Sequence, residues 1–398
     1  MKRFIPSIVL LLLSIATYSS SNIDGNWRGS LKLNDSIEVP FHFSIHGQTF
    51  MLINQTDKLS STEIQYSNDS VFIQLPVFDT ELRFKINDKL LNGTFINHTK
   101  KILTVIPCTA EQDVSYRFFD KPERASVNFT GRYDVHFQNE DAEGENAVGI
   151  FNQDGNYITG TFLTTTGDYR FLEGDVSGDQ FFLSTFDGSH VFYFYAKMVG
   201  DSLINGQFFS SLTWHDEWTG RKNHQAALPD AESFITYKQE PLHFSFPDEN
   251  GNMISIDDLR FQNRPVILQL MGSWCPNCMD ESRFLASWYL SKKNKIEILA
   301  LDFERITDTA RVNKTIRRLK KQLGINYTVV FAGSADKKEA AKLIPQLNRI
   351  FAFPTLIILN KNKQIVATHS GFSGPATGEE YEKFIRWFEK MVAQLLAE

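Results

Sequence analysis

The chain changes its pattern of apolar and polar residues once, between about residues 226 and 241. Before that point, short runs alternate apolar with polar side chains, and turn-forming pairs such as Asp187-Gly188 separate them. Examples of these runs are Phe41–Ile45, Val71–Leu75 and Val191–Tyr195. Such alternation is typical of strands that bury one face. Residues 22–238 are therefore predicted to be antiparallel and all-β, folded as a sandwich or a barrel.

A weak repeat runs through this all-β region. It opens with Gly25-Asn26-Trp27-Arg28-Gly29, and Thr130-Gly131-Arg132-Tyr133-Asp134 is a similar opening further along. Two interpretations are open: a β module 1 of residues 22–120 followed by a β module 2 of residues 121–238, or the ordinary turns and strands of one meander. We favour two modules, divided near Lys121-Pro122-Glu123.

From Leu242 onward, strand patterns and helix patterns alternate. The expected order is strand 265–271, helix 276–291, strand 296–302, helix 309–323, strand 327–331, helix 335–350, a hairpin of 355–359 with 364–369, and helix 378–396. Strands that alternate with helices and end in an antiparallel hairpin predict a mixed sheet with helices on both faces. We assign residues 239–398 to this α/β domain.

One motif with evident chemistry lies in the α/β part, Trp274-Cys275-Pro276-Asn277-Cys278. It falls between the apolar strand 265–271 and a helix, and Pro276 suits the first turn of that helix. The free N–H groups and the positive end of the helix dipole stabilise a thiolate on Cys275. Cys278 lies one helical turn further on, close enough to form an internal disulfide with Cys275. This context favours a redox-active pair.

The cysteine pair could also be half of a zinc site. A structural zinc site needs four ligands, but the only other cysteine, Cys108, lies far upstream, and we predict no metal. We interpret Cys108, which follows an apolar strand, as a buried free thiol rather than a functional partner. We likewise predict no cofactor, because a dithiol pair is itself a redox centre.

The C-terminal sequence, from about Pro241 to Glu398, resembles the TlpA/ResA-like branch of exported thiol–disulfide reductases in the thioredoxin superfamily. The likeness rests on Trp274-Cys275-Pro276-Asn277-Cys278, Glu281 and Phe353-Pro354-Thr355. It implies a thioredoxin-like fold and a protein-disulfide oxidoreductase that works mainly as a reductase. It also implies a disulfide-bearing protein as the substrate.

The resemblance further implies a role for each residue of the site. Cys275 would attack a substrate disulfide, and Cys278 would resolve the mixed disulfide, which leaves a redox disulfide between the two. The Pro354 bond would be cis and would present the backbone before it to an extended substrate segment. The residues implied for substrate binding are Trp274, Pro276, Phe353 and Pro354.

Glu281 is implied as a partly buried proton acceptor near the resolving cysteine. The alternative is a solvated glutamate, since the helix dipole favours a negative charge in the first turns. Thioredoxin carries a buried Asp on the strand before its nucleophile, at the position of Gln269 in this chain. An amide cannot take up a proton at neutral pH, so we expect Glu281, or water, to carry it.

The N-terminus predicts export. Lys2 and Arg3 precede an apolar segment, residues 4–16, which is shorter than the ~20 residues needed to span a bilayer. We predict a signal peptide over residues 1–21 and a periplasmic protein that is soluble after its cleavage, with an uncleaved anchor as the alternative. In an oxidising compartment, the electrons would come from a membrane thiol donor.

Three other functions compete with the reduction of protein disulfides. The same cysteines could serve an oxidase or isomerase if their reduction potential were high. A peroxidase is disfavoured, because the residues before Cys275 do not fit the Pro-x-x-x-Thr-x-x-Cys setting of peroxiredoxins. From another class, the all-β region could bind a glycan or a protein. The formal net charge of -6 is not the basic charge balance typical of proteins that bind nucleic acid, so we predict no nucleic-acid partner.

Two polar clusters in the all-β region stay ambiguous at this level. Asp168, Arg170, Asp187 and His190 could line a substrate groove, but we favour turn-forming residues and a surface ion pair. Trp214-His215-Asp216-Glu217-Trp218 has the polarity of an exposed loop and suits either a docking surface or an edge between packed domains.

Overall fold

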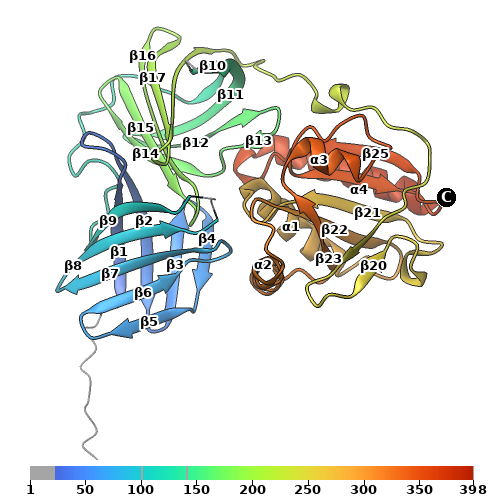
Figure 1. Ribbon diagram of the computed structural model, residues 1–398. Coiled ribbons are helices and arrows are strands. Elements are labelled where there is room, and N and C mark those ends of the chain that lie inside the picture. Colours follow the sequence, from blue (N-terminus) through green and yellow to red (C-terminus); the bar gives the residue numbers. More distant parts are fainter. Residues whose placement is uncertain (1–22, 100–101, 140–141, 398) are drawn as a thin grey trace, which may run out of the picture.

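The computed structural model describes residues 23–99, 102–139 and 142–397 (Figure 1). The predicted signal peptide, residues 1–21, lies outside the described residues. Two antiparallel sheets come first along the chain, and an α/β domain follows them (Figure 1). The predicted fold class, an all-β region followed by a thioredoxin-like α/β domain, is confirmed.

The first sheet is a meander in which the first strand along the chain pairs with the last. Its order is β4-β3-β2-β1-β9-β8-β7-β6-β5, so β1 lies beside both β2 and β9. Alternate side chains point inward, and the aromatic core includes Trp27, Phe41 and Phe43, each at most 1% exposed. The strands are β1 Gly25–Lys32, β2 Glu38–His46, β3 Thr49–Asn54, β4 Asp57–Ser61, β5 Ile64–Ser67, β6 Ser70–Gln74, β7 Thr80–Asn87, β8 Leu90–Asn97 and β9 Thr104–Gln112.

The second sheet closes into a barrel. Its order is β11-β10-β18-β17-β16-β15-β14-β12-β13, and β11 also pairs with β12, which joins the two ends. Closure removes the free sheet edges. The strands are β10 Gly131–Asn139, β11 Ala142–Asp154, β12 Tyr157–Thr164, β13 Gly167–Asp168, β14 Leu172–Ser177, β15 Gln180–Phe186, β16 Val191–Val199, β17 Ser202–Ser210 and β18 Trp214–Lys222.

The weak sequence repeat marks the same structural start in both sheets. Gly25 and Gly131 begin β1 and β10 with φ of 146° and 141°. Two residues later, Trp27 donates from its indole N–H to the carbonyl of Ile23, four residues back, at 2.9 Å. Tyr133 likewise donates from its hydroxyl to the carbonyl of Phe129, also four residues back, at 2.9 Å. The repeat therefore reflects a shared way of entering the first strand of each sheet.

The segment Trp214–Trp218 is a strand, not the exposed loop that its polarity suggested. It forms the start of β18, where side chains alternate between the two faces of the barrel wall. Trp218 is 2% exposed and packs in the barrel core, whereas Trp214 is 47% exposed. The sequence did not predict this strand, because the three residues between the tryptophans are all polar and show no alternation of apolar with polar side chains.

The C-terminal domain has a five-stranded sheet of order β23-β22-β21-β24-β25. The central β21 runs parallel to β22 and antiparallel to β24, so the sheet is mixed as predicted, and β24 and β25 form the predicted hairpin. The strands are β21 Val266–Met271, β22 Glu297–Glu304, β23 Thr328–Ser334, β24 Thr355–Leu359 and β25 Ile365–Ser370, and a small hairpin pairs β19 Ser245–Pro247 with β20 Met253–Ser255. The helices are α1 Pro276–Tyr289, α2 Thr309–Leu323, α3 Lys337–Lys342 and α4 Glu379–Ala397.

The predicted helix 335–350 is wrong beyond its first turns. The structure has only α3, with Asp336 as its N-cap, and the chain is irregular after Leu343. Pro345 explains the early end, because proline lacks an N–H and disfavours the helical conformation of the residue before it. Among the described residues, no helix combines the length and the apolar character that crossing a membrane requires.

A buried arginine joins the two sheets. Arg117, between β9 and β10, has a side chain that is 3% exposed and forms an ion pair with Glu173 of β14. It also donates to the hydroxyl of Ser184 at 2.9 Å and to the side chain of Asn54 at 3.3 Å. Asn54 belongs to the first sheet and Ser184 to the barrel, so the guanidinium spans their interface.

We expect Arg117→Met to lower the free energy of unfolding by about 3 kcal/mol, because it leaves the Glu173 carboxylate buried and uncompensated. Denaturant unfolding of the full chain, followed by circular dichroism, measures this change. Lys32→Met is the control, since the Lys32–Asp35 pair is exposed and should contribute little. A loss no larger than that of the control would contradict this role of Arg117.

Candidate active site

The two motif cysteines form a disulfide at the N-terminal end of α1. Strand β21 ends at Met271 and α1 begins at Pro276, so Cys275 is the N-cap, and its sulfur accepts the backbone N–H of Cys278 at 3.2 Å. Their Cα atoms are 5.2 Å apart. Cys275 is 4% exposed and Cys278 is fully buried, so Cys275 is the cysteine nearer to solvent.

Aromatic side chains and a cis-proline surround Cys275. Its sulfur lies 3.5 Å from the carbonyl oxygen of Phe353, and the Phe353–Pro354 peptide bond is cis, as the resemblance implied. The Trp274 ring meets the Phe353 ring edge-on at 5.8 Å, and the guanidinium of Arg305 lies 4.1 Å from the Trp274 ring centroid. The structure thus brings together the residues that the sequence assigned to substrate binding, with Pro276 half-buried beside them.

Glu281 is fully buried beneath the disulfide-bearing turn, which excludes the solvated alternative. One carboxylate oxygen accepts the Gln269 amide N–H at 2.8 Å, and the other has no hydrogen-bond partner among the described residues. The Gln269 oxygen accepts from the hydroxyls of Tyr327 at 3.1 Å and Ser282 at 3.2 Å, which fixes its amide to donate toward Glu281. Burial raises the pKa of Glu281 to about 8.

A pair of buried acids, which the sequence analysis missed, adjoins the motif. Glu304 of β22 accepts the backbone N–H of Ser273 at 2.9 Å. Asp302, two residues before Glu304 on the same strand, is fully buried. Burial, followed by the charge of Glu304, raises the pKa of Asp302. The sequence signal was the pair Asp302 and Glu304 at the end of an otherwise apolar run, since burying carboxylates is costly.

A turn from the barrel packs on the motif itself. The Asn277 side-chain amide donates to the carbonyl oxygen and to the carboxylate of Asp168, both at 3.2 Å. The same carboxylate accepts the N–H of Gly374 at 2.6 Å and the N–H of Arg170 at 2.5 Å. Burial raises the pKa of Asp168 to about 7. β13, which contains Asp168, lies on the side of the barrel that meets the C-terminal domain (Figure 1).

Arg170, expected in a surface ion pair, is instead buried among three carboxylates. It is 5% exposed and pairs with Asp280 at 2.8 Å, Asp57 at 2.9 Å and Asp187 at 3.3 Å. Burial alone would lower its pKa, but these carboxylates raise it well above the usual value. The three acids come from α1, the first sheet and the barrel, so the sequence could not show that they meet.

The first sheet reaches the same domain through the loop after β6. Val77 and Phe78 are buried in the hydrophobic cluster that contains both motif cysteines. Arg318 of α2 donates to the Phe78 carbonyl at 3.1 Å and to Asp79 at 3.2 Å. Both β-rich parts therefore contact the C-terminal domain close to its redox motif.

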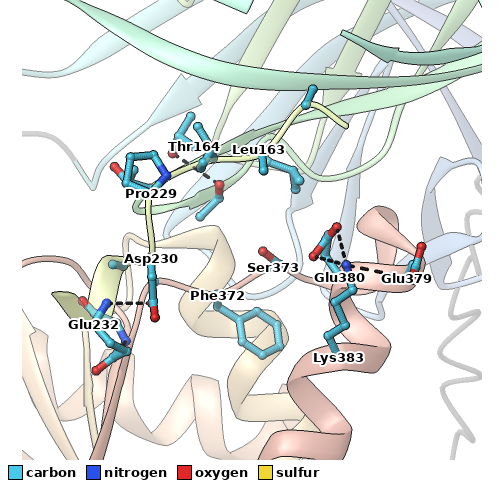
Figure 2. Close-up of a pocket in the computed structure, with 18 of the residues that line it drawn as sticks. Leu163, Thr164, Pro229, Asp230, Glu232, Phe372, Ser373, Glu379, Glu380 and Lys383 are labelled. Carbon is cyan, nitrogen blue, oxygen red and sulfur yellow. Dashed lines mark hydrogen bonds and ion pairs between the residues drawn. The ribbon is translucent and has the colours of Figure 1, made fainter. Parts of the chain in front are cut away.

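A cavity of about 510 Å³ lies where the barrel, the linker 224–232 and the C-terminal domain meet (Figure 2). Figure 2 shows Glu380 and Lys383 of α4 on one side and Glu232 of the linker on the other. Lys383 pairs with Glu380 at 3.2 Å, and Glu232 accepts from Ser370 and Thr368. Because these charged groups already have partners within the protein, we assign no ligand to the cavity.

Comparison with known proteins agrees with this geometry. Residues 226–385 match the Redoxin family. The C-terminal part of the chain is thus a thioredoxin-like domain. The thiol-disulfide oxidoreductase ResA of Bacillus subtilis (strain 168) is 23% identical over 164 residues, 41% of this chain and 83% of ResA.

Further relatives match the same Redoxin-type domain. ResA of Bacillus anthracis is 27% identical and covers 41% of this chain and 84% of its own length. A solved structure of a thiol-disulfide oxidoreductase from Bacteroides fragilis NCTC 9343 is 26% identical, with a TM-score of 0.27, and covers 37% of this chain and 99% of its own. The Redoxin match and the ResA relatives confirm the resemblance to ResA-like proteins. They also confirm the enzyme class, a protein-disulfide oxidoreductase.

The raised pKa of Glu281 predicts a dependence of stability on pH. The folded state holds this proton up to about pH 8, whereas the unfolded chain releases it near the ordinary value of 4.5, so the folded state binds more protons in between. The free energy of unfolding therefore falls as the pH rises from about 5 to 8. We expect Glu281→Gln to show a shallower fall.

Denaturant unfolding of the oxidised chain at several pH values measures this fall. Glu339→Gln is the control, because Glu339 is an exposed residue of α3. An unchanged pH profile in Glu281→Gln would contradict a protonated, buried Glu281.

Proposed function

We propose that the protein is an exported thiol–disulfide oxidoreductase that mainly reduces disulfides in other proteins, through the Cys275–Cys278 couple. The observation that carries this proposal is the position of Cys275, which caps α1 next to the Phe353 carbonyl and is nearer to solvent than Cys278. The ResA relatives, named thiol-disulfide oxidoreductases, support the same chemistry.

In the proposed reaction, the reduced protein begins with a thiolate on Cys275, which the N-terminal end of α1 stabilises. The thiolate attacks one sulfur of the substrate disulfide, and the other substrate sulfur leaves as a thiolate that takes up a proton. The sulfur of Cys278 then attacks Cys275 and releases the second substrate thiol. The substrate gains two electrons, and the enzyme is left with the internal disulfide.

Glu281 is proposed as the group that takes the proton from Cys278 when Cys278 attacks. It lies one turn beyond Cys278 on α1, and one of its oxygens is free of hydrogen bonds among the described residues. The ionised fraction of Glu281 acts as this base: a carboxylate with a pKa near 8 is a stronger base than an exposed one, which suits proton transfer from a thiol. Gln269 holds the other oxygen and so orients the carboxylate.

A substrate segment is proposed to lie against the backbone of Phe353 and beside the Trp274 ring. Both border the Cys275 sulfur, and Pro276 is half-buried on the same side. The stacking of Arg305 on Trp274 holds that ring in place. This arrangement favours an extended peptide over a folded surface, because Cys275 itself is nearly buried.

The cellular setting is proposed from the sequence. A signal peptide over residues 1–21 would direct the chain to the periplasm, where a membrane thiol donor would reduce the disulfide again after each turnover. Residues 22–120 and 121–238 would be two β modules carried with the thioredoxin-like domain, 239–398. The two β sheets and their shared opening at Gly25 and Gly131 support this division.

We expect Cys275→Ser to abolish reduction of a protein disulfide, because the attacking thiolate is lost. Cys278→Ser should still attack once and accumulate a covalent mixed disulfide with the substrate, visible by mass spectrometry and released by a small thiol. Cys108→Ser is the control and should keep wild-type turnover, since Cys108 is a buried free cysteine of β9.

Mixed-disulfide formation by Cys275→Ser but not by Cys278→Ser would reverse the two roles. Turnover with hydrogen peroxide that matches or exceeds turnover with a protein disulfide would refute the proposal in favour of a peroxidase.

A further inference from the structure

The barrel turn around Asp168 is in direct contact with the residue that separates Pro276 from Cys278. Asp168 accepts the Asn277 amide through both its backbone carbonyl and its carboxylate, although the two residues are 109 positions apart in the chain. Asn277 is 9% exposed, so this amide has left water and depends on the barrel for its hydrogen bonds. Nothing in the chemistry of a dithiol alone requires such a contact.

Glycine is required where this turn approaches the motif. Gly167 has φ of +154°, a conformation that side chains rarely adopt, and a Cβ at this position would lie 2.6 Å from the Asn277 side-chain oxygen. The backbone of the barrel therefore comes as close to Asn277 as packing allows.

The same turn also contacts α1 just beyond the motif. Arg170 binds the Asp280 carboxylate through two parallel bonds, from Nε at 2.8 Å and from Nη2 at 2.9 Å. Asp280 lies two residues after Cys278. A two-point contact of this kind fixes orientation as well as distance, and Asp57 and Asp187 hold Arg170 from the side of the β sheets.

Asp168 also connects the motif to the cis-proline segment. Its carboxylate accepts the N–H of Gly374, and in the same loop the N–H of Gly371 donates to the carbonyl of Pro354 at 2.8 Å. One barrel carboxylate thus touches both sides of the redox site, the cysteine motif and the loop that supports Pro354.

We propose that Asp168 and Arg170 are positioning residues of the redox site, through which the barrel sets the equilibrium between the disulfide and the dithiol. The inference rests on the proposed function, since it presumes that Cys275 and Cys278 are a working couple. Asp168 places a carboxylate beside the motif and fixes Asn277. Above about pH 7 the Asp168 carboxylate is ionised, and its negative charge opposes a thiolate on Cys275, so the barrel favours the disulfide form.

The test compares the full chain with its Asp168→Ala variant in glutathione buffers of graded composition at about pH 8, where Asp168 is mostly ionised. The measured quantity is the equilibrium constant between the disulfide and the dithiol, read from the fraction of alkylated cysteine. We expect Asp168→Ala to shift this constant toward the dithiol by about tenfold, which corresponds to about 30 mV.

Arg132→Met is the matched control. Arg132 joins the same barrel to the same C-terminal domain through Glu380 at 3.2 Å. It also donates to the carbonyl of Ala226, and neither partner belongs to the cysteine motif. This variant should lower the melting temperature and leave the equilibrium constant within about twofold of wild type.

An equilibrium constant that stays within twofold of wild type in Asp168→Ala, while the melting temperature falls as in the control, would overturn the inference and leave Asp168 a purely structural role. If Asp168→Ala does not fold, Asp168→Asn replaces it, because the amide removes the charge and keeps a side-chain oxygen that can accept a backbone N–H group. We expect that variant to shift the constant toward the dithiol by about threefold or more, and no shift would again overturn the inference. A wild-type chain without a reversible couple would instead refute the proposed function.

Discussion

The arrangement of the chain depends on the guanidinium of Arg170, which is buried among three carboxylates. Arg170 joins Asp57 of the first sheet, Asp187 of the barrel and Asp280 of α1. Taking these charges out of water is costly, and only the close, multiple pairing offsets the cost. Loss of the cation would leave three buried acids opposing one another, so the three parts of the chain are held in a single arrangement. The β-rich region is therefore packed against the redox motif rather than tethered beside it.

This packing changes what the thioredoxin-like domain presents to a substrate. The turn at Asp168 lies against Asn277, and the loop at Val77 and Phe78 is buried in the same cluster as the cysteines. Between them, the Cys275 sulfur faces the Phe353 backbone and the Trp274 ring. The β-rich region thus contributes to the shape around the disulfide, which gives a physical reason for carrying it on the same chain as the redox domain.

Local patterns predicted the α/β domain well because its elements carry their own signals. Helix α2 begins and ends as predicted, with Asp308 as its N-cap and Gly324 in the left-handed conformation at its end. The redox role of the cysteine motif could be predicted for the same reason, because both cysteines lie within one helical turn. The contact between Arg170 and Asp280 spans 110 residues and leaves no local trace. Closure of the barrel through β11 and β12 was equally hidden, because alternation predicts a strand but not its neighbour.

The equilibrium reduction potential of the Cys275–Cys278 couple, measured on the intact chain in a thiol buffer, tests the central claim most directly. A reductase that depends on an external thiol donor should have a potential near or below that of thioredoxin, about −270 mV. A value approaching about −120 mV would instead describe an oxidase and contradict the proposed direction of electron flow.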